Sequence, residues 1–503
     1  MSNPYIVLPI IFQLFLAILL MFCWTQKNLQ KLVSTVGSLI AVAIAVIMFA
    51  QVWKSGTLVT QAGNWGAPFG ITFVADTFSV LMVLLTTLSG LAVSVFSVGA
   101  VRNARVKFGY FPILHFLIMG LCGAFLAGDI FNLYVWFEII IISSFVLITI
   151  GGEKAQLEGS IKYVTMNLLA SVVFLTAIAV LYGLTGSLNM ADLSLKVAEI
   201  ENRGLVNVTA ILFLVGFGIK SAVFPLYFWL PASYHTPPPA ISAIFGGLLT
   251  KVGIYALLRV FTLIFIPDAF MITLISIMAA LTILSGGIGA MIQNNIRKIF
   301  SYLIICHIGF MLAGLGMYTE LAILGTVFYL VHDIIVKTNL FMVSGLIFKI
   351  KGTYSLRLLG GFYKDYPKLS LLMAIPLFSL VGIPPLSGFW AKFYLIRGGL
   401  EVDNLVLVGF IILGSFLTLF IIARFWSEAF WKTGEELPKK LKVKYYHELK
   451  PLKQKAMVVS ILFLAFISLG IGLGAEYVIQ VASRVAEELM NPQSYIEAVL
   501  GKL

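Results

Sequence analysis

Apolar runs of about twenty residues, long enough for a helix to cross a hydrocarbon core about 30 Å thick, recur from one end of the chain to the other. Of the 503 residues, 60% are hydrophobic and 11% are charged, and the mean hydropathy is +1.02. These values exclude a soluble globular domain, because such domains carry about twice this share of charged residues. The sequence therefore predicts an all-α polytopic membrane protein.

The apolar runs predict about fourteen transmembrane helices, near residues 4–24, 33–53, 73–98, 108–127, 129–150, 163–184, 204–225, 238–264, 268–292, 299–316, 320–348, 369–396, 403–428 and 456–481. The connections after odd-numbered helices hold 22 of the 34 Lys and Arg residues, whereas the opposite side, both termini included, holds six. Because basic loops stay on the cytoplasmic side, we expect a multi-pass protein of the cell membrane with both termini on the outer side. This asymmetry explains the net charge of +12 without nucleic acid as a partner.

Several ionisable side chains lie deep inside the apolar runs, where charge is costly unless a partner or water compensates it. Glu138 falls about 13 Å along a core of about 30 Å, close to the middle of its helix. Lys220, Lys251 and Lys392 are candidate proton carriers, because a buried ammonium group can release its proton whereas a guanidinium group cannot. Arg259 lies toward the end of its helix, so we expect it to pair or snorkel, and we keep it as a secondary proton-path candidate.

The helix expected near 320–348 holds three titratable groups within six residues: His332, Asp333 and Lys337. Asp333 and Lys337 stand four residues apart on one helix face. With His307 in the preceding helix, these groups could relay protons through side chains and water. Neither a metal nor a cofactor is expected, because no HExxH, CxxC, haem or nucleotide-binding pattern accompanies them.

Two of the predicted helices are interrupted by proline beside a lysine. Pro225 follows Lys220, and the pair Pro384 and Pro385 precedes Lys392. Proline removes backbone donors, and the freed carbonyls at membrane depth are tolerated only inside protein or beside water. Paired breaks of this kind point to a transport site at the interface of two internal repeats.

The spacing of the two breaks predicts the internal organisation. They lie five helices apart, and an odd number of helices per repeat inverts the second repeat relative to the first, so we expect two inverted five-helix repeats, each with a Pro-broken helix. The expected segments are an N-terminal three-helix segment (1–107), the first repeat (108–266), the second repeat (267–428), and an inner basic loop with the last helix and tail (429–503). On this alignment, His307 corresponds to Glu138.

Four stretches around the deep charged residues carry a family resemblance: FNLYVWFEIIIIS with Glu138, GIKSAVFPLYFWLPASYHTPPPAISAIFGGLLTKVGIYALLR with Lys220 and Lys251, HDIIVKTNLF with Lys337, and GIPPLSGFWAKF with Lys392. They resemble the antiporter-like subunits shared by Mrp-type sodium/proton antiporters and respiratory complex I. The likeness covers nearly the whole chain, and fourteen helices without a long lateral C-terminal helix most resemble the D-type subunits of Mrp complexes.

The resemblance implies a role for each matching residue. It implies that Glu138 pairs with Lys220, that Lys251 links two half-pathways, and that Lys337 and Lys392 carry protons to the far side. His332, which stands in the same motif as Lys337, is placed on the same path.

The function implied by the resemblance is that of a transporter subunit rather than an enzyme. It would move protons within a multi-subunit Na⁺/H⁺ antiporter, with other membrane subunits, H⁺, Na⁺ and the lipid bilayer as partners. The main alternative is a redox-driven proton-pumping subunit of complex I or of a membrane-bound hydrogenase. A stand-alone transporter fits less well because this family works in assemblies, and a purely structural role does not explain so many ionisable groups at depth.

Overall fold

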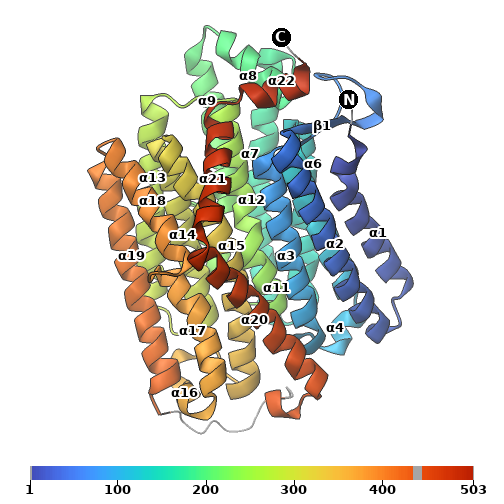
Figure 1. The fold of residues 1–503 in the computed structure, drawn as a ribbon, viewed down its shortest axis with the longest axis vertical. Coiled ribbons are helices and arrows are strands. Elements are labelled where there is room, and N and C mark those ends of the chain that lie inside the picture. Colours follow the sequence, from blue (N-terminus) through green and yellow to red (C-terminus); the bar gives the residue numbers. More distant parts are fainter. Residues whose placement is uncertain (1–2, 434–444, 502–503) are drawn as a thin grey trace.

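The computed structural model describes residues 3–433 and 445–501 (Figure 1). Within those ranges, twelve helices are long and apolar enough to cross a membrane, and two shorter apolar helices, α5 (Tyr110–Leu126) and α17 (Pro367–Val381), stand where two further ones were expected. The prediction of an all-α protein with about fourteen transmembrane helices is thus confirmed. The inner basic loop expected within 429–503 lies partly outside the described residues.

The main helices run along the long axis of the molecule and pack side by side (Figure 1). Besides α5 and α17 they are α1 (Leu8–Phe22), α2 (Lys27–Ser55), α3 (Thr77–Ala100), α6 (Ile130–Thr149), α7 (Lys154–Thr185), α9 (Arg203–Ser221), α12 (Thr250–Leu263), α13 (Ala269–Met291), α14 (Ile296–Met317), α15 (Glu320–Lys351), α18 (Ser387–Glu401), α19 (Leu405–Trp426) and α20 (Pro451–Leu473). The shorter helices are α4 (Asn103–Lys107), α8 (Met190–Glu199), α10 (Trp229–Ser233), α11 (Pro239–Ile244), α16 (Phe362–Asp365), α21 (Ala475–Met490) and α22 (Gln493–Leu500).

A short antiparallel hairpin lies between α2 and α3. Strands β1 (Leu58–Gln61) and β2 (Thr72–Ala75) pair in the register Leu58 to Ala75. The chain then enters α3 through Asp76, whose carboxylate accepts a hydrogen bond from the backbone N–H of Ser79 at 2.9 Å. Asp76 therefore caps the helix N-terminus, as Asp commonly does at this position.

The first predicted break follows α9. The helix ends at Ser221, and Ala222 takes a left-handed conformation with φ of 59°. The chain then runs past Pro225 without helical structure until α10, and the indole N–H of Trp229 donates to the carbonyl of Ile219 at 3.1 Å. The same carbonyl also accepts the backbone N–H of Ala222 at 3.0 Å, so the last turn of the interrupted helix is satisfied by both bonds.

The second predicted break follows α17 and is built in a similar way. Gly382 takes a left-handed conformation with φ of 88°, and α18 begins at Ser387 after the two prolines. The ammonium of Lys392 donates to the carbonyl of Val381, the last residue of α17, at 2.7 Å. The predicted interruptions are confirmed, and each lies beside a lysine.

The helix expected near 238–264 is not a uniform α-helix. It begins as α11, passes through a π-helical turn at Phe245–Leu249 and continues as α12. In an α-helix each carbonyl accepts the backbone N–H four residues later, and a π turn leaves a carbonyl without this partner. Here the ammonium of Lys251 donates to the carbonyl of Gly246 at 2.7 Å. The π turn was not predicted, because Gly and Leu residues here read as ordinary helix.

Helix α15 lies at the centre of the bundle. It packs against α14, α18, α11, α20 and α21, and 94% of its most apolar stretch is buried. A helix buried on all sides has no face toward lipid, so any polar group on it must meet another protein group or water. In this position α15 contacts helices from early in the chain, α3 and α11, as well as helices that follow it, α18, α20 and α21.

The C-terminal end differs from the expected last helix near 456–481. Helix α20 ends at Leu473, and α21 follows Gly474 as a separate segment that packs against α15, α12 and α3 (Figure 1). Gly474 separates the two helices because its N–H bonds to a carbonyl of α20 while its backbone leaves helical geometry. The predicted membrane helix is present as α20, but it ends at Leu473, and the prediction that it continues to residue 481 is wrong.

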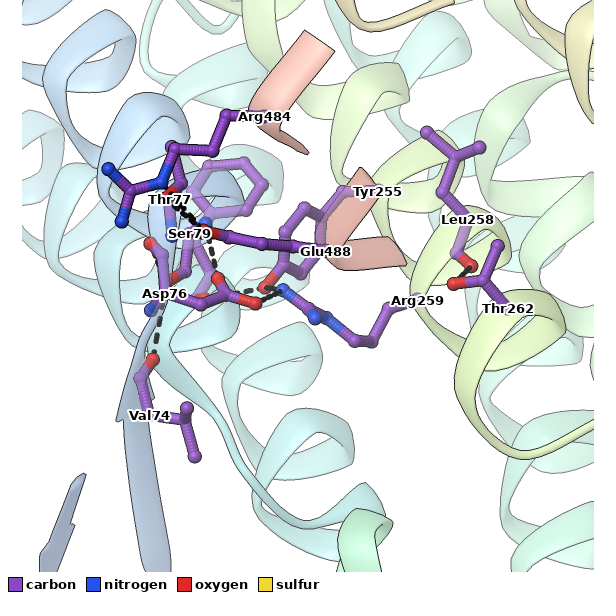
Figure 2. A network of polar contacts seen from close by, with 11 residues as sticks. Val74, Asp76, Thr77, Ser79, Tyr255, Leu258, Arg259, Thr262, Arg484 and Glu488 are labelled. Atoms are coloured by element: carbon purple, nitrogen blue, oxygen red, sulfur yellow. Dashed lines mark hydrogen bonds and ion pairs between the residues drawn. The ribbon is translucent and has the colours of Figure 1, made fainter. Parts of the chain in front are cut away.

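Figure 2 shows the contacts that fasten α12 and α21 to the start of α3. The Arg259 guanidinium forms an ion pair with Asp76 at 2.6 Å, and Glu488 accepts hydrogen bonds from Thr77 and Arg484. Arg484 also donates to the carbonyl of Trp53 in α2 at 2.7 Å. The contacts of Glu488 and Arg484 hold α21 against α3 and α2, and the Arg259 ion pair holds α12 against the start of α3.

Candidate functional site

The first polar cluster joins α6, α7 and α9. The Lys220 ammonium donates to the hydroxyl oxygen of Ser171 at 3.2 Å, and the Ser171 hydroxyl donates to the carboxylate of Glu138. The resemblance implied a pair between Glu138 and Lys220. Within the described residues the two groups are connected through Ser171, and a direct ion pair is not formed.

The environment of this cluster is largely apolar. Lys220 and Ser171 are buried, and the ammonium lies 4.9 Å from the centre of the Phe137 ring, within the range of a cation–π interaction. Glu138 is partly exposed on the face of α6 that it shares with Tyr134. A carboxylate at this depth is costly unless a partner group, a neighbouring protein or water compensates it.

A small cavity adjoins Lys220. Its volume is about 20 Å³, and its walls include Tyr163, Asn167, Trp229 and Tyr234. A cavity needs roughly 10–15 Å³ to hold one water molecule, so this space admits about one. The hydroxyl of Tyr234 is buried and has no protein partner among the described residues, which makes it a ready partner for that water.

A larger cavity of about 270 Å³ lies on the side of the bundle opposite the two termini. Four basic residues, Arg102, Arg105, Arg297 and Lys349, contribute to its wall, together with His235. Because His235 and the adjacent residue 234 line different cavities, the loop between α10 and α11 separates the large space from the small one beside the first cluster.

The second polar cluster lies between α12, α14 and α15 and is fully buried. Lys251 forms an ion pair with Asp333 at 2.7 Å, and the same carboxylate meets Nδ1 of His307 at 3.0 Å. The sequence spacing suggested that Asp333 and Lys337 interact along one helix face. In the structure the close partner of Asp333 is Lys251 on the neighbouring helix.

Lys337 lies one turn further along α15 and is also fully buried. Its ammonium has no hydrogen-bond partner among the described residues, nor does the Nε2 atom of His307. Buried polar groups are nearly always satisfied, and an unpaired ammonium in the hydrocarbon region is especially costly. A water molecule could satisfy both groups by hydrogen bonding, and hydrogen-bonded water also conducts protons.

The third polar cluster surrounds the second helix break. Nδ1 of His332 lies 2.8 Å from the hydroxyl of Ser387 at the start of α18, and this hydroxyl also meets Ser379 at 2.7 Å and Ser468 at 3.2 Å. Helices α15, α17, α18 and α20 thus contribute to one chain of polar groups. Lys392 stands further along α18, with its ammonium 5.5 Å from the centre of the Phe310 ring.

Further buried polar atoms without protein partners adjoin the clusters. The hydroxyls of Ser221, which follows Lys220, and of Thr250, which precedes Lys251, are buried and unpartnered among the described residues. Helices α9 and α12 approach closely at Ser221: a Cβ added to Gly253 would lie only 2.2 Å from the Ser221 hydroxyl. Polar groups of this kind are what a chain of water molecules requires for hydrogen bonding.

The structure thus places most of the predicted residues in three polar clusters, of which the first lies beside the first broken helix and the third beside the second. These clusters together are called the row. The row consists of Glu138, Lys220, Lys251, Asp333, His307, Lys337, His332 and Lys392. Arg259 is not part of it, because its guanidinium is held by Asp76 and the Tyr255 hydroxyl (Figure 2). Arg259 was expected to pair or to snorkel, and it forms an ion pair with Asp76.

Sequence reasoning missed the hydroxyl groups. Ser171 lies in the helix expected near 163–184, where no residue was singled out, and Ser379, Ser387 and Ser468 were not singled out either. Serine is frequent in membrane helices and usually bonds to its own helix backbone, so it carries little signal by itself. The useful signal was position, since Ser387 directly follows the Pro384–Leu386 break.

Within the described ranges, no group of three or more His, Cys, Asp or Glu side chains is arranged to hold a metal ion. The chemistry that the row itself offers is that of its ammonium, imidazole, carboxylate and hydroxyl groups. All four exchange protons or conduct them through hydrogen bonds.

Comparison with known proteins places the chain in a family. Residues 127–418 match the family described as "NADH:quinone oxidoreductase/Mrp antiporter, TM". The chain is 43% identical over 499 residues to the D subunit of a Na(+)/H(+) antiporter from Bacillus subtilis, with 99% of each chain covered. It is 42% identical over 499 residues to the protein of the same name from Alkalihalophilus pseudofirmus, again with 99% of each chain covered.

The fold is also shared with chains of solved complexes. A chain of the Mrp complex from Dietzia sp. DQ12-45-1b superimposes with a TM-score of 0.90 at 28% identity, and 99% of each chain is covered. A chain of the archaeal membrane-bound sulfane sulfur reductase superimposes with a TM-score of 0.87 at 26% identity, and 99% of each chain is covered. The matched region spans the whole polar row, and this protein belongs to the NADH:quinone oxidoreductase/Mrp antiporter transmembrane family.

Proposed function

We propose that this protein is the proton-translocating subunit of a multi-subunit Na⁺/H⁺ antiporter. The observation that carries the proposal is the set of titratable groups, most of them buried, that lie in three polar clusters from the first broken helix to the second. Such groups are expensive in a membrane interior and mark ion or proton pathways. The names of the relatives at 43% and 42% identity agree with this function.

The proposed mechanism is a sequence of proton transfers along the row. Glu138 and Lys220 exchange a proton at one end, and Lys251, held by Asp333, links this couple to the central helix. Lys337, whose ammonium has no close protein partner in the described part of the chain, passes the proton through water toward Lys392. Moving one charge across 100 mV changes its free energy by about 2.3 kcal/mol, so the membrane potential can drive this path against a sodium gradient.

The proposal includes the orientation and the partners. The excess of Lys and Arg on one side favours both termini on the outer side of the cell membrane, and labelling of single cysteines introduced near residues 3 and 501 in intact cells would test it. The partly exposed Glu138 supports a neighbouring membrane protein on the α6 face. The division into inverted repeats, 108–266 and 267–428, is proposed on the similar construction of the two breaks.

A second candidate function is a proton-pumping subunit of a redox-driven complex. It is favoured by the structural likeness to a chain of the sulfane sulfur reductase, described as an archaeal respiratory membrane complex. The two functions use the same row and differ in the source of energy. Sodium dependence separates them.

The test is sodium-dependent collapse of an imposed pH gradient in membrane vesicles. The complete set of subunits is expressed in an antiporter-deficient host, and no respiratory substrate is present after energisation. The proposed function predicts a sodium response in the wild type and its loss in Glu138→Ala at equal membrane abundance. A fully assembled wild-type complex without any sodium response would instead support the redox-driven function.

A further inference from the structure

Helix α7 presents a polar stripe toward the first cluster. Tyr163, Asn167 and Ser171 are spaced four residues apart, so they share one helix face. Tyr163 and Asn167 line the small cavity beside Lys220, and Ser171 contacts Lys220 itself. The buried face of this helix therefore leads from a water-sized space to the Glu138 and Lys220 couple.

The hydrogen bonds of Ser171 differ from those of another buried serine on the same helix. The hydroxyl of Ser160 donates to the carbonyl of Leu157 in its own helix at 2.7 Å, which is the usual arrangement for serine in a membrane helix. The hydroxyl of Ser171 instead connects two neighbouring helices, accepting from Lys220 and donating to Glu138. Its hydrogen bonding is therefore directed at the charged groups.

The chemistry of a hydroxyl suits this place. An ammonium group can only donate and an ionised carboxylate can only accept, whereas a hydroxyl accepts and donates at the same time. A hydroxyl between them thus forms a continuous donor–acceptor chain, N–H to Oγ and Oγ–H to carboxylate. An apolar side chain of the same size would interrupt that chain.

We propose that Ser171 is a further proton-transferring residue of this subunit, with its hydroxyl as the carrier between Lys220 and Glu138. In the transfer, one N–H bond of the Lys220 ammonium breaks and its proton bonds to Ser171 Oγ, while the original Ser171 O–H bond breaks and its proton bonds to a carboxylate oxygen of Glu138. The products are a neutral amine, an unchanged hydroxyl and a carboxylic acid. This inference rests on the proposed function, because it assigns a step of the same proton path.

The experiment compares four variants in the complete complex, using sodium-dependent antiport in vesicles at equal membrane abundance. Ser171→Ala removes the carrier, Ser171→Thr keeps a hydroxyl, and Ser171→Gly leaves room in which a water molecule can restore the chain. Ser160→Ala is the matched control, since it removes a buried hydroxyl from the same helix that bonds only to the backbone. Glu138→Ala is measured alongside to test the proposed function.

We expect Ser171→Ala to lower the maximal antiport rate by about tenfold or more while the sodium concentration at half-maximal rate stays unchanged, because only proton transfer is impaired. The maximal antiport rate of Ser171→Thr or of Ser171→Gly should be clearly higher than that of Ser171→Ala. The rate of Ser160→Ala should equal that of the wild type. A purely structural role would not give this rescue.

Two results would overturn the inference. If Glu138→Ala is inactive and Ser171→Ala works at the wild-type rate, the proposed function stands and the role of Ser171 falls. The proposed role of Ser171 is also contradicted if, in assembled complexes, neither Ser171→Thr nor Ser171→Gly has a higher antiport rate than Ser171→Ala. If Glu138→Ala itself retains full antiport, the proposed path through this couple fails, and the step assigned to Ser171 fails with it.

Discussion

At the residue scale, the row depends on which groups can release a proton. Lysine and arginine carry the same charge, but the guanidinium keeps its proton at every accessible pH. The structure separates the two types accordingly: Lys220 contacts the Ser171 hydroxyl, whereas Arg259 is fixed in an ion pair with Asp76. The lysines are therefore the members of the row whose chemistry can be tested by a change that conserves charge.

Lys220→Arg should abolish antiport although it preserves the positive charge. The expected rate is below about one tenth of the wild type, because a permanently protonated group blocks the exchange with Glu138. The measurement is sodium-dependent antiport in vesicles, with the amount of assembled complex determined in parallel. Normal antiport in a well-assembled Lys220→Arg complex would contradict a proton-releasing role for Lys220.

Most charged members of the row could be predicted from the sequence, because an ionisable residue inside an apolar run stands out. Glu138 and Lys251 were found in this way. The partner of a charged residue is harder to predict: Asp333 pairs with Lys251 across two helices and not with Lys337 along its own. Ser171 was missed because its role depends on which helices are neighbours, and this is decided by packing.

At the element scale, the two broken helices position the row. Prolines mark the two breaks in the sequence, and the positions of both breaks were predicted correctly. The π turn at Phe245–Leu249, which presents the Gly246 carbonyl to Lys251, was not predicted since no residue type marks it. The partner helix at each close contact was likewise not predicted, because a glycine in an apolar run does not reveal which helix it meets.

Gly388→Ala should disturb the second break. A Cβ at this position would lie 2.0 Å from the carbonyl oxygen of Ser379 and 2.9 Å from Cε1 of His332, so α18 must move away from α17. Overpacking of this kind typically costs about 1–3 kcal/mol, and here it would also displace His332 from Ser387. We expect a lower melting temperature of the purified complex together with reduced antiport.

The matched control for this variant is Gly470→Ala in α20, where a Cβ would meet no heavy atom within 4 Å. It should keep the wild-type melting temperature or raise it slightly, since alanine favours a helix more than glycine does. Equal melting temperatures for the two alanine variants would show that the contact at Gly388 does not restrain the break.

At the scale of the whole molecule, α15 joins the two halves of the row, and α21 packs against it (Figure 1). The number of membrane helices followed directly from the apolar runs. The C-terminal end did not, because α21 is amphipathic and its position depends on contacts with α2, α3 and α12 that no local pattern encodes. Continuity between the halves depends on one ion pair, Lys251 with Asp333.

The most direct test of the account is therefore antiport by a complex carrying Lys251→Met, with the double variant Lys251→Met and Asp333→Asn as a control that removes both buried charges together. Both variants interrupt the row at its centre and leave the Glu138 and Lys392 ends intact. The account predicts that sodium-dependent proton movement in vesicles falls below about one tenth of the wild-type rate in both, with the complex still assembled. Wild-type antiport in either assembled variant would contradict a proton path along this row.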